Sequence, residues 1–278
     1  MTPGIHQMTM PEYLALDALS SGRAHRVLSQ SPAHAKYAER EENAKMDFGS
    51  LAHKLLLENT EEGLLIVEAD DWRTKAAKEL RDAAREDGRI PVLSKQMPAV
   101  RLMAKVARDF VAQSEIASVF DSGAPEQTIV WQEGDILCKA RPDWLNDKTI
   151  LHYKTTEGSA SPATFIRNQL FPMGYDMAAM FYERGLGGAR QSVFLVQEAY
   201  EPYACSLIGL DPATAELAAE KVDRAISIWQ ECVRTGVYPA YVPKIHYAEP
   251  MPWHLADKEV RDLNDAYDQL QGKEGLQP

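Results

Sequence analysis

Apolar residues recur at helical spacing along much of the chain. In segment 44–58, Phe48, Leu51, Leu55 and Leu56 fall on one face, which predicts an amphipathic helix. Similar patterns predict helices over 74–87, 98–111, 161–171, 174–184 and 211–234, and Ser161-Pro162 and Asp211-Pro212 are start signals for two of them. The first 60 residues are expected to be helical, with loop-like stretches at Ser20, Ser21 and 29–33 that supply N-caps.

The middle of the chain has β-type patterns instead. Strands are predicted over 127–131, 136–140 and 149–155, forming an antiparallel meander, and over 192–199 and 203–208. We therefore expect a mixed α/β fold in one domain, 1–245, with a helical part over about 1–115 and a core over about 120–240. Residues 246–278 are expected to form an acidic tail or helix.

Composition narrows the setting of the protein. The chain has 278 residues, and its three cysteines, Cys138, Cys205 and Cys232, are far apart, so a disulfide framework is not expected. No apolar run reaches the length of a membrane span, and no secretory signal begins the chain. We expect a cytoplasmic protein without a membrane partner.

Charge is unevenly distributed. The net charge of −11 argues at first against a nucleic-acid partner. However, residues 72–109 carry ten Lys or Arg and five Asp or Glu, whereas residues 198–278 carry seven and fourteen. The basic stretch, including Arg73 and Lys75, is therefore a candidate DNA-backbone surface.

Three residues are candidates for chemistry. Asp143 ends one predicted strand, and His152 and Lys154 share a face of the next because they are two residues apart. A carboxylate, a second ligand and a lysine at one end of a hairpin suit metal-assisted hydrolysis, in which the lysine stabilises charge on a phosphate. An exposed strand lysine after a Pro-Asp turn is the plainer interpretation of this spacing.

Several ordered motifs carry a resemblance. The segments RPDWL (141–145) and ILHYKTT (150–156) resemble motifs II and III of the PD-(D/E)XK nuclease superfamily. Together with SQSPAHAKY (29–37), FGSLAHKLLLE (48–58) and YDMAAMFY (175–182), they resemble the exodeoxyribonuclease VIII group of phage and prophage recombination exonucleases. The resemblance covers about residues 10–240.

The resemblance implies a restriction-endonuclease-like core, with a central mixed sheet flanked by helices, and a Mg²⁺- or Mn²⁺-dependent site. It implies digestion of linear duplex DNA from 5′ to 3′, a single-strand annealing partner and a ring-shaped homo-oligomer of three or four chains. By this resemblance Lys154 and Asp143 are catalytic. The implied metal ligands are His53, Asp143, His152 and Glu126. The candidate DNA contacts are Tyr175, Tyr182 and Arg141, together with Arg73 and Lys75 of the basic stretch.

Two positions depart from the group's motifs. His152 stands where motif III has Asp, and Ala178 stands where the motif IV helix has Gln. Because Mg²⁺ prefers oxygen ligands and imidazole suits Mn²⁺ better, the first change bears on metal choice. Three interpretations fit: a weakened or Mn²⁺-preferring nuclease, an inactive relative that binds DNA ends or a host or phage protein, or an active enzyme in which His152 is an introduced substitution. An unrelated metal hydrolase on the same scaffold is a further alternative.

Overall fold

The computed structural model describes residues 1–38, 44–188 and 190–274. The chain forms two compact units, Met1–Ala240 and Tyr241–Pro278. The second unit contains one helix, α10 (Pro252–Glu274), and all features of the candidate site lie in the first.

One sheet of the first unit has the strand order β1-β6-β7-β2. Its strands are β1 (Gly4–His6), β2 (Leu19–Ser20), β6 (Thr128–Glu133) and β7 (Ile136–Ala140). The expectation of an all-helical N-terminal part is therefore wrong for β1 and β2. Both are short edge strands whose partners lie more than a hundred residues away, so their pairing leaves no local sequence pattern.

A second sheet, of order β11-β10-β9-β8-β5, carries the candidate site. It consists of β5 (Ala124–Pro125), β8 (Trp144–Leu145), β9 (Thr149–Thr156), β10 (Gln191–Glu198) and β11 (Cys205–Ile208). Since β9 and β10 are parallel and the other pairs antiparallel, the predicted mixed sheet is confirmed.

The predicted three-stranded meander is wrong in its third strand. β6 and β7 pair as expected, but β9 pairs with β8 and β10 in the second sheet. Pro142 cannot donate a ladder hydrogen bond, and the chain leaves the first sheet there. The two-residue strand β8 then starts a new hairpin with β9.

The predicted helices are present. They are α4 (Ala44–His53) with the π-helical continuation η1 (Lys54–Glu58), α5 (Lys75–Glu86), α6 (Met97–Ala112), α7 (Pro162–Phe165) with η3 (Ile166–Leu170), α8 (Tyr175–Gly185) and α9 (Pro212–Thr235). The N-terminal part adds α1 (Met10–Ala15), α2 (Ser21–Ser29) and α3 (Pro32–Tyr37), and the short helix η2 (Ser94–Gln96) precedes α6. The parallel pair β3 (Leu64–Val67) and β4 (Ile90–Leu93) was not predicted.

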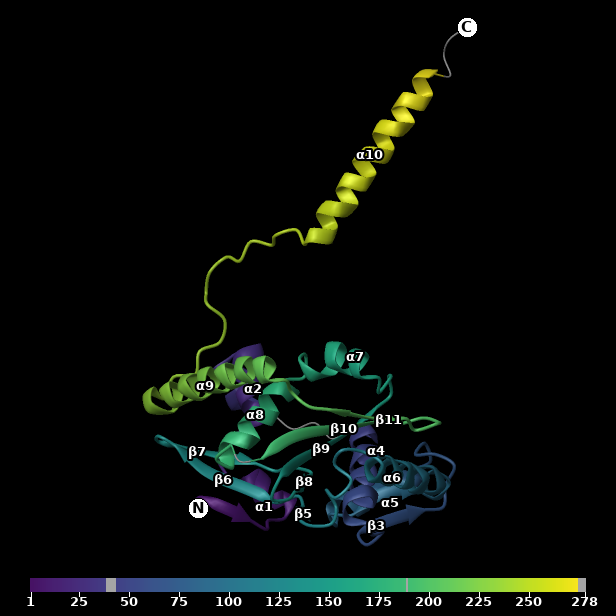
Figure 1. Cartoon of the computed structure of the whole chain (residues 1–278), viewed down its shortest axis with the longest axis vertical. Coiled ribbons are helices and arrows are strands. Elements are labelled where there is room, and N and C mark those ends of the chain that lie inside the picture. Colours follow the sequence, from purple (N-terminus) through teal and green to yellow (C-terminus); the bar gives the residue numbers. More distant parts are fainter. Residues whose placement is uncertain (39–43, 189, 275–278) are drawn as a thin grey trace. The chain divides into compact units, whose positions relative to one another are not determined.

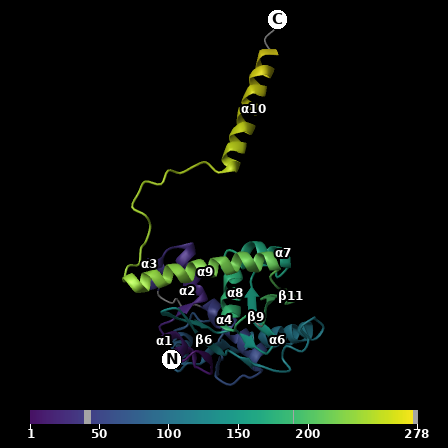
Figure 2. The same ribbon diagram turned by 60° about the vertical axis from the view of Figure 1, so that its left-hand side comes forward.

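Helices cover both faces of the second sheet (Figures 1 and 2). One face, with Leu151, Tyr153 and Leu195, packs against α4, η1 and α6. The other face packs against α7, η3 and α8, and α9 lies over α8 and α2. Residues that alternate along β9 therefore belong to different cores, and His152 and Lys154 face the α8 side. Among the described residues, no helix is long and apolar enough to cross a membrane.

Candidate active site

The carboxylate of Asp143 lies at the open edge of β9. β8 pairs with β9 only at Ile150 and Leu151, so the backbone beyond these residues has no strand partner on that side. Asp143 Oδ2 accepts a hydrogen bond from the Tyr153 backbone N–H at 2.7 Å. The side chain thus takes the place of the missing strand, and this bond sets its position.

His53 lies near the same carboxylate, on the face of the sheet that α4 covers. It is the last residue of α4, which packs on β9, and π-helical geometry, often found at functional sites, begins at the next residue. Its Nδ1 lies 3.6 Å from Asp143 Oδ1, and its ring lies 4.9 Å from the ring of Tyr153. Burial lowers the pKa of His53 more strongly than Asp143 raises it, so the ring is neutral near pH 7.

Lys154 completes this group from the α8 side of the sheet. Its Nζ lies 3.3 Å from Asp143 Oδ2 and 5.6 Å from the centre of the Tyr175 ring. Burial disfavours the ammonium, but the Asp143 carboxylate outweighs it and the pKa of Lys154 is raised. For Asp143, burial is outweighed by the nearby Lys154 and His53, so its pKa is lowered. The pair is therefore charged at neutral pH.

His152 lies beside Lys154 but makes different contacts. Its Nε2 is 3.4 Å from Ser192 Oγ on β10, and its ring stacks on Phe194 at 4.6 Å. It is 3% exposed, and burial lowers its pKa to about 3, so the imidazole is neutral. The contacts hold the ring against β10 and its neighbours.

Glu126 and Arg141 form an ion pair next to this group. Arg141 Nη2 lies 2.7 Å from Glu126 Oε2, and its Nη1 donates to the Met8 carbonyl and to Thr128 Oγ1. The Glu126 backbone N–H donates to the Asp143 carbonyl oxygen at 3.1 Å. Arg141 is thus engaged inside the protein, where it holds Glu126 against the segment between β7 and β8 that contains Asp143.

The two tyrosines of α8 face the site. The ring of Tyr182 lies 5.2 Å from that of His152, and its hydroxyl bonds the Ser21 side chain and the Arg141 backbone. Tyr175 lies on Phe194 at 6.0 Å and beneath Lys154. Both therefore line the α8 side of the site.

Arg73 and Lys75 lie elsewhere. They flank the start of α5, which packs on β3 and β4, and they pair with Asp71 and Glu79. Several other basic residues of this stretch also have acidic partners, among them Arg81, Arg89, Arg101 and Lys105. The structure does not bring Arg73 and Lys75 to Lys154, and these ion pairs offset much of the local positive charge.

The donor set can be compared with what a divalent ion requires. In the described part of the chain, no group of three or more His, Cys, Asp and Glu side chains is arranged to hold an ion. His53 and Asp143 do supply two adjacent donors. Mg²⁺ is commonly held by one or two carboxylates together with substrate phosphates and water. The pair fits an ion on those terms, and its imidazole favours Mn²⁺.

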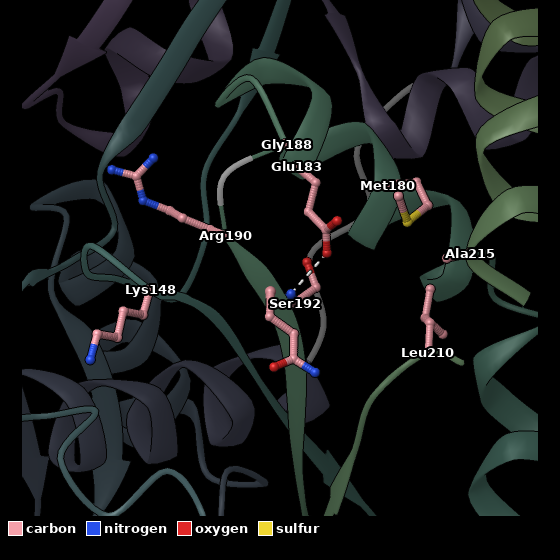
Figure 3. Close-up of a pocket in the computed structure, with 9 residues that line it drawn as sticks. Lys148, Met180, Glu183, Gly188, Arg190, Ser192, Leu210 and Ala215 are labelled. Carbon is pink, nitrogen blue, oxygen red and sulfur yellow. Dashed lines mark hydrogen bonds between the residues drawn. The ribbon is translucent and has the colours of Figure 1, made fainter. Parts of the chain in front are cut away.

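A depression of about 430 Å³ lies at the start of β10, beside Gln191 and Ser192 (Figure 3). Glu183 accepts a hydrogen bond from the Ser192 N–H at 2.8 Å there, while Lys148 and Arg190 extend away from that pair. Because Ser192 also contacts His152, this depression and the candidate site share one residue of β10.

Acid is expected to destabilise the fold through His152. Its pKa is about 3 in the folded chain and near 6.5 when unfolded, so between these values the unfolded state binds more protons. The stability is complete above about pH 6.5 and is lost as the pH falls, by about 2 kcal/mol at pH 5. Urea unfolding at pH 7 and pH 5 measures this loss.

The change His152→Phe should reduce this pH dependence, while His246→Phe, at an exposed position, should not. His53, whose pKa is also lowered, will keep part of the dependence in both variants. If the pH dependence of stability is unchanged in His152→Phe, the loss of stability in acid does not come from His152.

Sequence reasoning missed three residues that surround His152. Ser192 and Phe194 belong to β10, a buried strand with no sign of polar function in its pattern, and His25 lies on α2. Each is brought to the site by pairing or packing between distant segments, so spacing along the chain could not have identified them.

Comparisons with known proteins agree with this architecture. A crystal structure of a "Putative exonuclease" from Eubacterium rectale is similar, with a TM-score of 0.54 and 10% sequence identity over 90% of this chain and 98% of that one. At this identity, the likeness shows the fold alone. No curated protein matches the chain. The family described as "PDDEXK-like domain of unknown function (DUF3799)" matches residues 25–250, most of the chain and all of the candidate site, and the protein belongs to this family.

Proposed function

We propose that the protein is a metal-dependent deoxyribonuclease that hydrolyses phosphodiester bonds at the Asp143 site. One observation carries the proposal. Three side chains of suitable chemistry gather around the Tyr153 backbone: His53 from α4, Asp143 from the residue before β8, and Lys154 from β9. Membership of a PDDEXK-like family supports the same class of reaction.

Each residue has a role that follows from its charge. Asp143 is ionised at neutral pH because its pKa is lowered, so its carboxylate can accept a hydrogen bond from a water molecule and orient it for attack. The Lys154 ammonium can stabilise the negative charge that develops on the phosphate. His53 is neutral, so one nitrogen of its ring can donate a lone pair to a metal ion. A divalent ion held by His53 and Asp143 would supply Lewis-acid activation of the phosphate and of water.

The finer assignments come from the resemblance to exodeoxyribonuclease VIII. We include in the proposal 5′ to 3′ digestion of linear duplex DNA, a ring-shaped homo-oligomer of three or four chains, a single-strand annealing partner and a cytoplasmic location. The neutral ring at position 152 supports lower activity with Mg²⁺ than with Mn²⁺, since one carboxylate is missing.

Digestion of linear duplex DNA with Mg²⁺, Mn²⁺ or EDTA tests the proposal, with closed circular DNA to separate exonuclease from endonuclease activity. We expect the linear form to be digested, faster with Mn²⁺, and the circle to survive. Asp143→Asn, which has nearly the same shape and no charge, should abolish digestion. A lack of digestion with both ions would refute the enzyme assignment.

The contacts of His152 favour a second candidate, a protein that binds DNA ends without cutting them. Its ring is held by Ser192 and Phe194, which leaves His53 and Asp143 as the adjacent donors among the residues that the structure describes. This candidate predicts retention of blunt-ended DNA in a gel-shift assay and no cleavage with either ion.

A further inference from the structure

A cavity of about 160 Å³ opens beside Lys154 on the α8 side of the sheet. Its walls come from α2, α8, β9 and β10. His152 and Ala178, the two positions that depart from the exonuclease motifs, both line it. Two changes that are 26 residues apart in the sequence therefore alter one space next to the candidate catalytic lysine.

Aromatic rings dominate the wall of this cavity. His152 and Phe194 stack with an interplanar angle of 20°, and Tyr182 packs against His152. Tyr175 also lies against Phe194, at an angle of 28°. An aspartate at position 152 would put a charge among these rings, whereas the neutral imidazole adds another planar, weakly polar surface. The wall is therefore suited to a flat, uncharged group.

The size of the cavity limits that group. A cavity of about 150 Å³ with apolar walls holds one benzene molecule, so about 160 Å³ accepts a single six-membered ring and not a fused pair. Ala178 contributes to this space because the glutamine expected at its position would extend several atoms further.

We propose that this cavity is a base pocket that takes one unpaired pyrimidine of a DNA strand whose phosphate lies at Lys154 and Asp143. The inference rests on the proposed function in that it needs DNA at this site, but it does not need cleavage. Lys154 lines the cavity and lies 3.3 Å from Asp143, so a phosphate at that pair has its own base within reach.

Two consequences follow for the substrate. A paired base cannot enter a pocket of this kind, so frayed or single-stranded ends are preferred over closed duplex. Phe194 and His152 are buried against each other, so the shape of the cavity selects the base by its size, and not by stacking on these two rings or by its hydrogen-bonding edge. Thymine and cytosine are therefore accepted alike and purines are disfavoured.

Fluorescence anisotropy in EDTA tests the pocket without cleavage. The probes are labelled single strands of about eight nucleotides, the length scale of a typical single-strand site. One contains only thymine, one only cytosine, one only adenine, and one lacks bases. We expect the two pyrimidine strands to bind about 10-fold more tightly than the adenine strand and the strand without bases.

Ala178→Leu, which fills the cavity, should abolish the preference for pyrimidines. The matched control is Ala215→Leu, which places the same side chain in the depression of Figure 3 and should keep the preference. Circular dichroism melting checks that both variants fold. If Ala178→Leu does not fold, the relative affinities of the four strands for the unaltered protein decide whether the base pocket exists.

The outcomes separate the two proposals. Equal binding of all four strands, or a preference that survives in Ala178→Leu, would overturn the base pocket and leave the nuclease assignment standing. Absence of binding to every strand would likewise overturn the base pocket, whereas only the absence of digestion with both ions would overturn the nuclease assignment. A pyrimidine preference without any cleavage would support the pocket in a protein that binds DNA and does not cut it.

Discussion

Lys154→Ala is expected to lower the rate of DNA hydrolysis by about 100- to 1,000-fold, the usual loss when one preorganised group that stabilises transition-state charge is removed. The ammonium lies 3.3 Å from Asp143, and its raised pKa keeps it charged. Single-turnover digestion of linear duplex DNA at saturating Mn²⁺ measures the effect on chemistry, because product release then does not limit the rate.

Two variants make this measurement specific. Lys148→Ala removes an exposed lysine from the turn before the same strand, and its rate should equal that of the unaltered protein. Lys154→Arg keeps the positive charge and should retain more activity than Lys154→Ala. If Lys154→Ala digests DNA within threefold of the unaltered rate, about 0.7 kcal/mol, then Lys154 has no catalytic role.

His152→Asp is expected to have the second large effect, on both stability and metal response. The new carboxylate would be buried among aromatic rings, near the Asp143 charge and near Lys154, whose ammonium already pairs with Asp143. An uncompensated buried charge costs about 3 kcal/mol, which lowers the melting temperature of a domain of this size by about 6–12 °C. An ion that binds only the folded chain offsets this loss, so Mg²⁺ should restore the melting temperature.

Thermal melts with EDTA and with Mg²⁺ measure this response, followed by digestion of linear DNA with Mg²⁺. His152→Asn is the matched control, because it has a similar shape and no charge, and Mg²⁺ should not stabilise it. A His152→Asp variant that melts like the unaltered protein in EDTA and ignores Mg²⁺ would show that position 152 lies outside any metal site.

Local patterns predicted most of the helices. α5 begins after its Thr74 cap and α6 runs over Met97–Ala112, because helix periodicity and capping depend on residues within a few positions of one another. The failures concern pairing. β9 was assigned to the wrong sheet, and β1, β2, β3 and β4 were missed, because strand partners are chosen by distant segments.

The sequence by itself determined the mixed α/β class, the two departures at His152 and Ala178, and the candidates Asp143, Lys154 and His53. The fold class, Asp143 and Lys154 follow from residue types and short spacings, whereas His53 and the two departures follow from the resemblance of the ordered motifs. Only the tertiary structure decided which candidates meet. Pairing of β8 with two residues of β9 leaves the Tyr153 backbone open, so Asp143 can bind there between His53 and Lys154. Packing of α8 on β10 places His152 and Ala178 in one cavity, since side chains from separate elements become neighbours only when their faces are buried together.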